Sequence, residues 1–305
     1  MNLKTNNHLI KAISIALPKN PHNIKEELKI CNLTENKYEL LKQNSGIFKH
    51  YVSNDNTFAS DLATKALKRL LDENLINKNE IDMIIFNTFT PDFLAPSCSS
   101  LVHKNLNLNE NTICIDLIGY CSGFLQGLKQ AFIALDNENI NKIILICANV
   151  KSKKIDKKDK ITFLNTSDSA SAILIEKSKN YEKAIFSNKI FSTLCDKETL
   201  PTNNINKNYN EHIKIDANLS FSFIMENFPL FFNDIFKNLN IDKKNINDFL
   251  FNSTSSFFKK KLFDNLNMKY KEDEVLKNYG DLNINKLALD LAHINGGGYK
   301  ENFAC

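Results

Sequence analysis

The stretch DLIGYCSGF at residues 116–124 indicates both the fold and the chemistry of this chain. An apolar strand ends here, Gly119 permits a sharp turn, and Cys121 then stands at the expected start of a helix. Because a helix N-terminus stabilises negative charge, we expect this position to lower the pKa of the thiol. Gly123 would let a substrate approach the backbone closely. The pattern predicts a nucleophilic Cys121, with a buried structural cysteine as the alternative.

Strand and helix patterns alternate on both sides of this stretch. Apolar runs predict strands, and amphipathic or capped runs predict helices. The predicted strands are 10–16, 81–86, 112–117, 142–150 and 170–176, and the predicted helices are 58–75, 97–106 and 122–135. This alternation is typical of βαβ units in an α/β protein with a parallel or mixed sheet.

The second half of the chain has a similar pattern. We predict strands at 183–192, 249–251 and 287–293, and helices at 221–239 and 256–266. Two α/β halves of similar layout suggest an ancient duplication. We therefore expect an N-terminal half, residues 1–178, that carries the cysteine, and a C-terminal half, residues 179–305.

Composition excludes several classes of protein. The 305 residues are 43% hydrophobic and 24% charged, with a net charge of +4, which argues against a disordered chain and a dedicated nucleic-acid binder. Asn and Lys number 45 and 38, whereas Arg69 is the only arginine, which we interpret as a compositional bias of the source genome. Any bound anion must therefore be held by Lys, backbone N–H groups or a helix N-terminus. The seven cysteines form no CxxC pair, so we expect free thiols, no metal and no cofactor.

Two further patterns concern location and surface. The N-terminal sequence does not resemble a signal peptide, and no apolar run approaches the ~20 residues of a membrane helix, so we expect a cytoplasmic protein without a membrane partner. The basic run KSKKIDKKDK at residues 151–160 is expected to be a solvated loop. The alternative is a surface that docks an acidic partner or a phosphate.

The order of short motifs along the chain resembles the β-ketoacyl-acyl-carrier-protein synthase III family of the thiolase superfamily. The motifs are SGI at 45–47, TPDFLAPS at 90–97, GYCSGF at 119–124, TSDSASA at 166–172, YG at 279–280 and GGG at 296–298. The resemblance implies a five-layered αβαβα thiolase-like fold and a homodimer. It also implies an acyl-thioester on Cys121 and an oxyanion hole made by the backbone N–H groups of Cys121 and Gly297.

The chain departs from the family at two catalytic positions. Asn252, in FNSTS, stands where the family has a His, and Asp281 follows Tyr-Gly where the family has an Asn. In the family these residues bind the malonyl thioester carbonyl and assist decarboxylation. We therefore retain Asn252 and Asp281 as catalytic candidates, with Asp281 suited to act as a general base and His293 as another possible base.

The resemblance also implies where the acyl donor and acyl chain bind. Lys160 matches a basic position that contacts coenzyme A, although the family's Trp and Arg near Leu40 and Asn44 are missing. An acyl-carrier protein is thus a more plausible donor than acyl-CoA. Ala95, contributed by the partner subunit, would border a roomy acyl pocket.

These expectations leave three functions open. The first is acyl transfer to malonyl-carrier protein with condensation. The second is O- or N-acyl transfer to a small molecule without decarboxylation. The third is a non-catalytic subunit that forms a heterodimer with an active paralogue.

Overall fold

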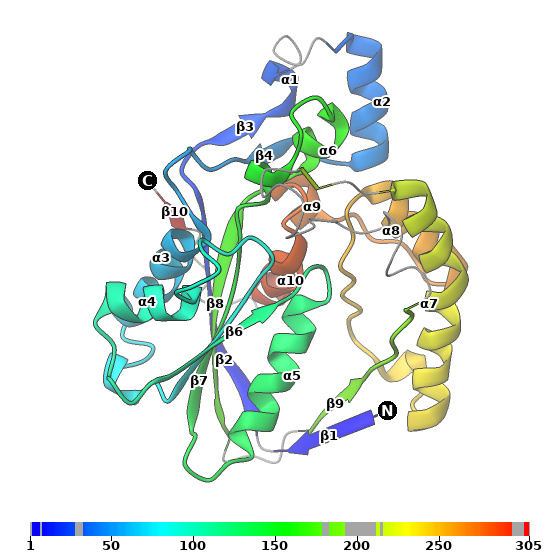
Figure 1. Ribbon diagram of the computed structural model, residues 1–305. Helices are drawn as coiled ribbons and strands as arrows, with labels where there is room; N and C mark the ends of the chain where they lie inside the picture. The colour runs from blue at the N-terminus through cyan, green and yellow to red at the C-terminus, as the bar shows by residue number, and fades with distance from the viewer. Residues whose placement is uncertain are drawn as a thin grey trace.

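A six-stranded mixed sheet lies at the centre of the molecule, which is represented by a computed structural model (Figure 1). The structure describes residues 2–6, 8–27, 33–178, 183–192, 212–213, 216–294 and 302–304. The strand order is β10-β2-β8-β7-β5-β6. The bounds are β2 His8–Pro18, β5 Met83–Thr88, β6 Ile113–Ile118, β7 Lys142–Asn149, β8 Ser169–Lys177 and β10 Asn302–Ala304.

Strand direction within this sheet places the site. Strands β5, β6 and β7 are parallel to one another, whereas β8 is antiparallel to both β7 and β2. The loops that follow β5, β6 and β7 therefore emerge at the same edge of the sheet. Cys121 follows β6 and residue 151 follows β7, so topology alone brings these two segments to one edge.

Helices cover both faces of the sheet (Figure 1). One face packs against α3 (Ala59–Asp72) and α4 (Cys98–Leu106), and the other packs against α5 (Gly123–Leu135) and α10 (Lys286–Ile294). Side chains alternate accordingly along β5, where Ile84 and Phe86 join the first core and Met83 and Ile85 join the second. This period of two explains why the central strands are apolar throughout: both faces are buried.

Smaller elements surround this layer structure. Two pairs of short strands are antiparallel, and the remaining helices include two that pack through a phenylalanine-rich cluster, α7 and α8. The bounds are β1 Asn2–Asn6, β9 Lys183–Ser187, β3 Pro21–Asn23, β4 Lys49–Tyr51, α1 Ile24–Glu27, α2 Glu35–Ser45, α6 Lys160–Asn165, α7 Ala217–Leu239, α8 Ser256–Asn265 and α9 Glu274–Tyr279. The 3₁₀ turns are η1 Lys78–Glu80, η2 Lys151–Lys154, η3 Lys243–Asn245 and η4 Asn283–Asn285.

The predicted elements of the first half are confirmed, as are α7, α8 and the start of the strand at 183. Two predictions in the second half are wrong, and the strand predicted at 183–192 ends at Ser187. Residues 249–251 form no strand, because Phe249 and Phe251 pack instead into the aromatic cluster around Phe232. Residues 287–293 lie in helix α10, since a short apolar run does not distinguish a buried helix from a buried strand.

The boundary between halves at 178/179 falls just after β8, and the two-half organisation stays a prediction. Across the described residues, the longest helices are too short or too polar to pass through a lipid bilayer.

Candidate active site around Cys121

Cys121 lies in the turn that joins β6 to α5 and is partly exposed. The turn is closed by the backbone N–H of Gly123, which donates to the carbonyl of Tyr120 at 2.8 Å. Helix α5 begins at Gly123 with Ser122 as its N-cap, so Cys121 precedes the helix by two residues. The predicted strand–turn–helix context of the cysteine is confirmed.

The two glycines that flank Cys121 are required by packing. A Cβ atom at Gly119 would lie 2.4 Å from Asn87 Oδ1, and one at Gly123 would lie 2.5 Å from Ile284 Cδ1. Asn87 is fully buried and its Nδ2 donates to the carbonyl of Gly123 at 2.8 Å. The sequence analysis expected a substrate to approach the backbone closely at Gly123. In the structure, the side chains of Asn87 and Ile284 make that close approach.

Two asparagine amides reach Cys121 from the second half of the chain. Asn283 Nδ2, at the start of η4, donates to Cys121 Sγ at 3.4 Å. Asn252 Nδ2, in the loop before α8, donates to the Cys121 carbonyl at 2.7 Å. Both amide oxygens are buried, and within the described residues neither accepts a hydrogen bond. Asn252 thus lies beside Cys121, and Asn283 is a neighbour of the thiol that the sequence analysis missed.

Asp281 forms a buried ion pair next to these amides. Its Oδ2 lies 2.7 Å from Lys151 Nζ, and the two side chains are only 6% and 3% exposed. Its Oδ1 accepts from the backbone N–H of Asn283 at 2.9 Å, which holds Asn283 in place. Lys151 also lies over the ring of Tyr120, 5.8 Å from its centroid.

The solvated-loop prediction for residues 151–160 is therefore wrong in its first half, where η2 forms and Lys151, Ser152 and Ile155 are buried. Lys151 is buried because Asp281 neutralises it, whereas Lys157 and Lys158 are exposed as expected. A signal existed in the sequence. Lys151 directly follows a buried strand that is parallel to the strand before Cys121, so both segments had to meet at one edge.

The charges around the thiol decide its protonation. Burial raises the pKa of Cys121 to about 11, and the negative charge of Asp281 acts in the same direction. Lys151 and the hydrogen bond from Asn283 act to lower that pKa but do not outweigh burial. The expected lowering of the thiol pKa by the helix start is wrong, because Cys121 lies outside α5 and desolvation dominates.

The same environment affects the neighbours of the thiol. Burial raises the pKa of Tyr120 to about 12, so its phenol stays protonated. Burial favours the neutral amine of Lys151, but the carboxylate of Asp281 outweighs it and raises the pKa of Lys151. Lys151 is thus a permanent cation beside the thiol.

The TSDSASA motif positions Lys151 and Asp281. Asp168 is fully buried and accepts hydrogen bonds from the backbone N–H and Oγ of Ser152, at 2.9 and 2.6 Å, and from the backbone N–H of Ser53 at 2.8 Å. These bonds fix η2, which carries Lys151. The backbone N–H of Ser167 donates to the carbonyl of Asp281 at 3.1 Å, which fixes the other partner of the pair.

The remaining predicted site residues lie in several places. Ala95 is exposed in the loop between β5 and α4, and Lys160 is the first residue of α6 and partly exposed. His293 is exposed near the end of α10, with Nδ1 at 2.9 Å from the carbonyl oxygen of Leu289. Gly297 lies outside the described residues. The roles assigned to these four residues stay predictions.

Comparisons with known proteins agree on one family. The family model described as 3-oxoacyl-[acyl-carrier-protein (ACP)] synthase III matches residues 115–193. The chain is 34% identical over 154 residues to a β-ketoacyl-[acyl-carrier-protein] synthase III of Ehrlichia canis, covering 50% of this chain and 48% of that protein. It is also 34% identical over 178 residues to a putative 3-oxoacyl-[acyl-carrier-protein] synthase 3 of Campylobacter jejuni, covering 58% and 50%. The chain spans about half the length of the curated relatives it matches.

Solved structures extend the likeness of the fold to nearly the whole chain. A 3-oxoacyl-(acyl-carrier protein) synthase of Burkholderia xenovorans LB400 superposes with a TM-score of 0.85 at 19% identity, covering 95% of this chain and 86% of that one. Cerulenin-bound OleA of Xanthomonas campestris superposes with a TM-score of 0.81 at 15% identity, and the match covers 96% of this chain and 90% of that one. The predicted thiolase-like fold is confirmed, and over about half of its length the chain is similar to 3-oxoacyl-[acyl-carrier-protein] synthase III proteins.

Proposed function

We propose that the chain is an acyl-thioester transferase in which Cys121 takes an acyl group from a carrier thioester. The observation that carries this proposal is the placement of Cys121, a partly exposed residue whose Sγ lies 3.4 Å from the Asn283 amide and near the buried Lys151–Asp281 pair. The sulfur attacks the carrier's thioester carbonyl, so an Sγ–acyl bond forms and the carrier's sulfur–acyl bond breaks. One thioester replaces another, and the carrier leaves as a thiol after gaining the proton that Cys121 lost.

The proton on Cys121 has to be removed during this attack. With a pKa of about 11, roughly one thiol in ten thousand is ionised at pH 7. We assign Asp281 as the proton acceptor, because its carboxylate acts electrostatically on the thiol. Lys151 then stabilises the negative charge that develops on sulfur, which a buried ammonium does more strongly than an exposed one.

The acyl acceptor we favour is a hydroxyl or an amine. Asn252 stands where the family has a His, and an amide does not titrate in a useful range, so assisted decarboxylation of a malonyl group is disfavoured. The buried oxygens of Asn252 and Asn283 have no donor among the described residues. An incoming O–H or N–H group would supply that donor, whereas a thioester carbonyl would add only another acceptor.

The donor and the dimer follow from surface features. An acyl-carrier protein is the favoured donor, with acyl-CoA as the alternative, because lysines dominate the cationic surface and carrier proteins are acidic.

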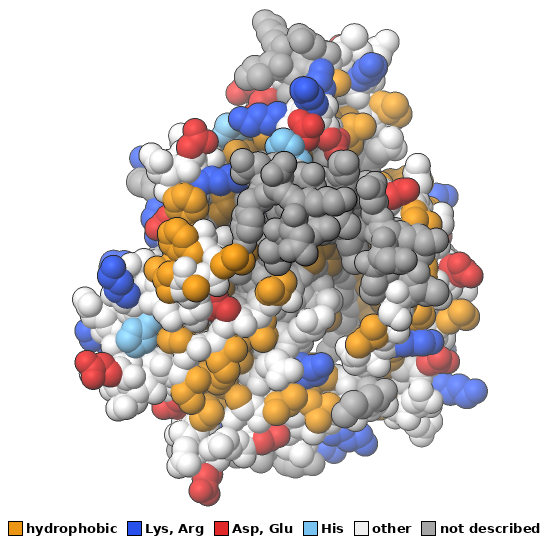
Figure 2. Space-filling view, in the orientation of Figure 1, with side chains coloured by type: hydrophobic (Ala, Val, Ile, Leu, Met, Phe, Trp, Pro, Cys, Tyr) orange, Lys and Arg blue, Asp and Glu red, His pale blue; other side chains and the backbone are white. Residues whose placement is uncertain are grey.

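Ile113, Ile115 and Ile118 are exposed on β6, which is an edge strand of the sheet. Figure 2 shows hydrophobic side chains gathered over β6 and α5. Pairing of two chains along this edge would form the homodimer and bring Ala95 to the partner's acyl pocket.

Intact-mass spectrometry after incubation with acyl-carrier protein or acyl-CoA tests the proposal. We expect one acyl adduct on the unmodified chain, none on Cys121→Ser, and an unchanged adduct on Cys114→Ser, which removes another partly exposed thiol. Release of the acyl group by added alcohols or amines supports transfer. Absence of the adduct from the unmodified chain would favour a non-catalytic partner subunit, and its persistence in Cys121→Ser would mean that another residue takes the acyl group. Rapid release of CO₂ from malonyl-carrier protein would instead show condensation.

A further inference from the structure

A second cluster of reactive side chains lies away from Cys121, where β3, α1 and β4 meet. His22 Nδ1 is 2.8 Å from Glu27 Oε1, and His50 Nε2 is 2.6 Å from Glu27 Oε2. The ligand atoms of these three residues all lie within 4.8 Å of one another. The proposed acyl transfer uses none of them.

His50 shows what kind of ligand this cluster suits. Its side chain is fully buried, and Nδ1 lies 3.0 Å from the carbonyl oxygen of Thr166. Because a carbonyl can only accept, Nδ1 carries a hydrogen, and Nε2 of the neutral ring then presents a lone pair. That lone pair faces an oxygen of Glu27, so a proton or a metal ion has to lie between these two acceptors. An imidazole that donates Nδ1–H to a backbone carbonyl and presents Nε2 is the arrangement found in metal-ligating histidines.

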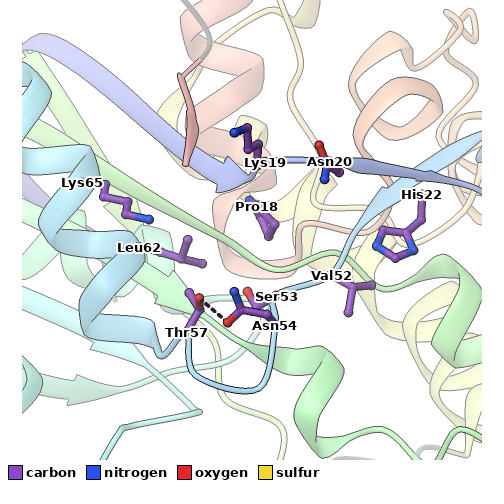
Figure 3. Close-up of a pocket in the computed structure, with 10 residues that line it drawn as sticks. All are labelled: Pro18, Lys19, Asn20, His22, Val52, Ser53, Asn54, Thr57, Leu62 and Lys65. Carbon is purple, nitrogen blue, oxygen red and sulfur yellow. Dashed lines mark hydrogen bonds between the residues drawn. The ribbon is translucent and has the colours of Figure 1, made fainter. Parts of the chain in front are cut away.

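We propose that His22, Glu27 and His50 bind one divalent transition-metal ion, with Zn²⁺ as the expected occupant. Two imidazole nitrogens and one carboxylate form a ligand set that Zn²⁺ accepts with a fourth position left for water. The His22 side chain is 41% exposed, and it lines a surface cavity together with Lys19, Asn20 and Val52. Figure 3 shows His22 at one end of this cavity, so an ion held by His22 would lie near solvent. The absence of CxxC pairs bears only on cysteine-based zinc sites.

The proposed ion would be coupled to the segment that positions Asp281. Thr166, which accepts the hydrogen bond from His50, forms a parallel β-bridge with Asp281. Metal binding would therefore tie β3 and α1 to the backbone that carries the Lys151–Asp281 pair. We expect it to raise the melting temperature of the chain, because the ion binds the folded state and not the unfolded one.

The competing occupant is a proton, which would make the cluster a histidine–glutamate ion pair. The 2.6 Å separation of His50 Nε2 and Glu27 Oε2 is one that such a hydrogen-bonded ion pair also adopts. The two occupants differ in a direct way: only a metal ion gives a stoichiometric titration with Zn²⁺ or Co²⁺.

The test is a metal titration of the full chain after treatment with a chelator. We expect one equivalent of Co²⁺ to give visible bands of four- or five-coordinate cobalt, without the near-ultraviolet thiolate-to-cobalt band that a cysteine ligand produces. Zn²⁺ should displace the Co²⁺, and its affinity is then measured against a chromophoric chelator. His22→Ala should weaken Zn²⁺ binding by at least about 100-fold, the upper range for loss of a supporting group.

Control variants keep the test decisive. His212→Ala removes an exposed histidine outside the cluster and should leave the Zn²⁺ affinity unchanged. Glu27→Gln and His50→Gln should weaken binding as His22→Ala does, but the partly exposed His22 is the safer site if His50→Gln does not fold. Failure to bind one equivalent, binding that survives His22→Ala, or a thiolate band would each overturn the metal site. Since affinity is measured without substrate, this outcome is independent of acyl transfer.

Discussion

Replacing Lys151 with Met should damage both the stability and the chemistry of the Cys121 site. The change leaves the Asp281 carboxylate, 6% exposed, without the ammonium that now lies 2.7 Å away. Removing one partner of a buried ion pair typically costs about 3–5 kcal/mol, because the remaining charge is desolvated and unpaired. The unfolding free energy of Lys151→Met should fall by about that amount.

The same substitution should slow alkylation of Cys121. Lys151 lowers the pKa of the thiol and Asp281 raises it, so loss of Lys151 moves the pKa further above 11. The rate of reaction with iodoacetamide at pH 8 follows the thiolate fraction, and it should fall roughly tenfold for each unit of increase. Asp281→Asn should act in the opposite direction on the thiol pKa, because it removes the negative charge.

Urea unfolding and pH-dependent alkylation check these expectations. Lys153→Met is the matched control, since it removes a partly exposed lysine from the same 3₁₀ turn. The double variant Lys151→Met/Asp281→Asn should recover much of the lost stability, because no unpaired charge remains. If Lys151→Met and Lys153→Met have the same unfolding free energy and the same rate of Cys121 alkylation, the buried ion pair determines neither the stability nor the thiol reactivity of this site.

Three other outcomes are expected. Peptide mapping should show that iodoacetamide labels Cys121 before the fully buried Cys147, and equal labelling of the two would contradict an accessible nucleophile. Gly123→Ala should lower the unfolding free energy measured in urea by about 1–3 kcal/mol, because the new Cβ would lie 2.5 Å from Ile284 Cδ1. An unchanged unfolding free energy would mean that the turn readily shifts. Acyl loading measured by intact mass should not fall steeply from two carbons to several, and Ala95→Phe should restore a preference for short chains. Loading of acetyl alone on the unmodified chain would reject the open pocket.

The first half of the fold could be predicted from the sequence because its signals are local. The buried run at β5 and the amphipathic spacing of α3 each determine their own element type, and Ser97 and Pro96 mark the start of α4. Cys121 could be found in the same way, since a strand, a glycine turn and a helix start follow one another in residues 116–124.

The second half shows where local signals fail. Residues 287–293 form a short apolar run that fits a strand and a helix equally well in sequence. The i,i+4 contact of Lys286 with Asp290, together with burial against the sheet, selects the helix α10. Phe249 and Phe251 are residue types that favour a strand. Their side chains instead pack into the aromatic cluster formed with residues of α7 and α8, and within the described part of the chain they pair with no strand.

The chemistry of the site depended on tertiary structure for a different reason. Lys151 and Asp281 are 130 residues apart in the chain, and Asn283 and Cys121 are 162 apart, yet each pair is in contact. The sequence alone determined that Cys121 occupies a strand–turn–helix junction suited to a nucleophile. Only the tertiary structure decided that the thiol is partly desolvated and lies beside a buried ion pair, because burial and Coulomb interactions depend on distances in space and not on separation along the chain.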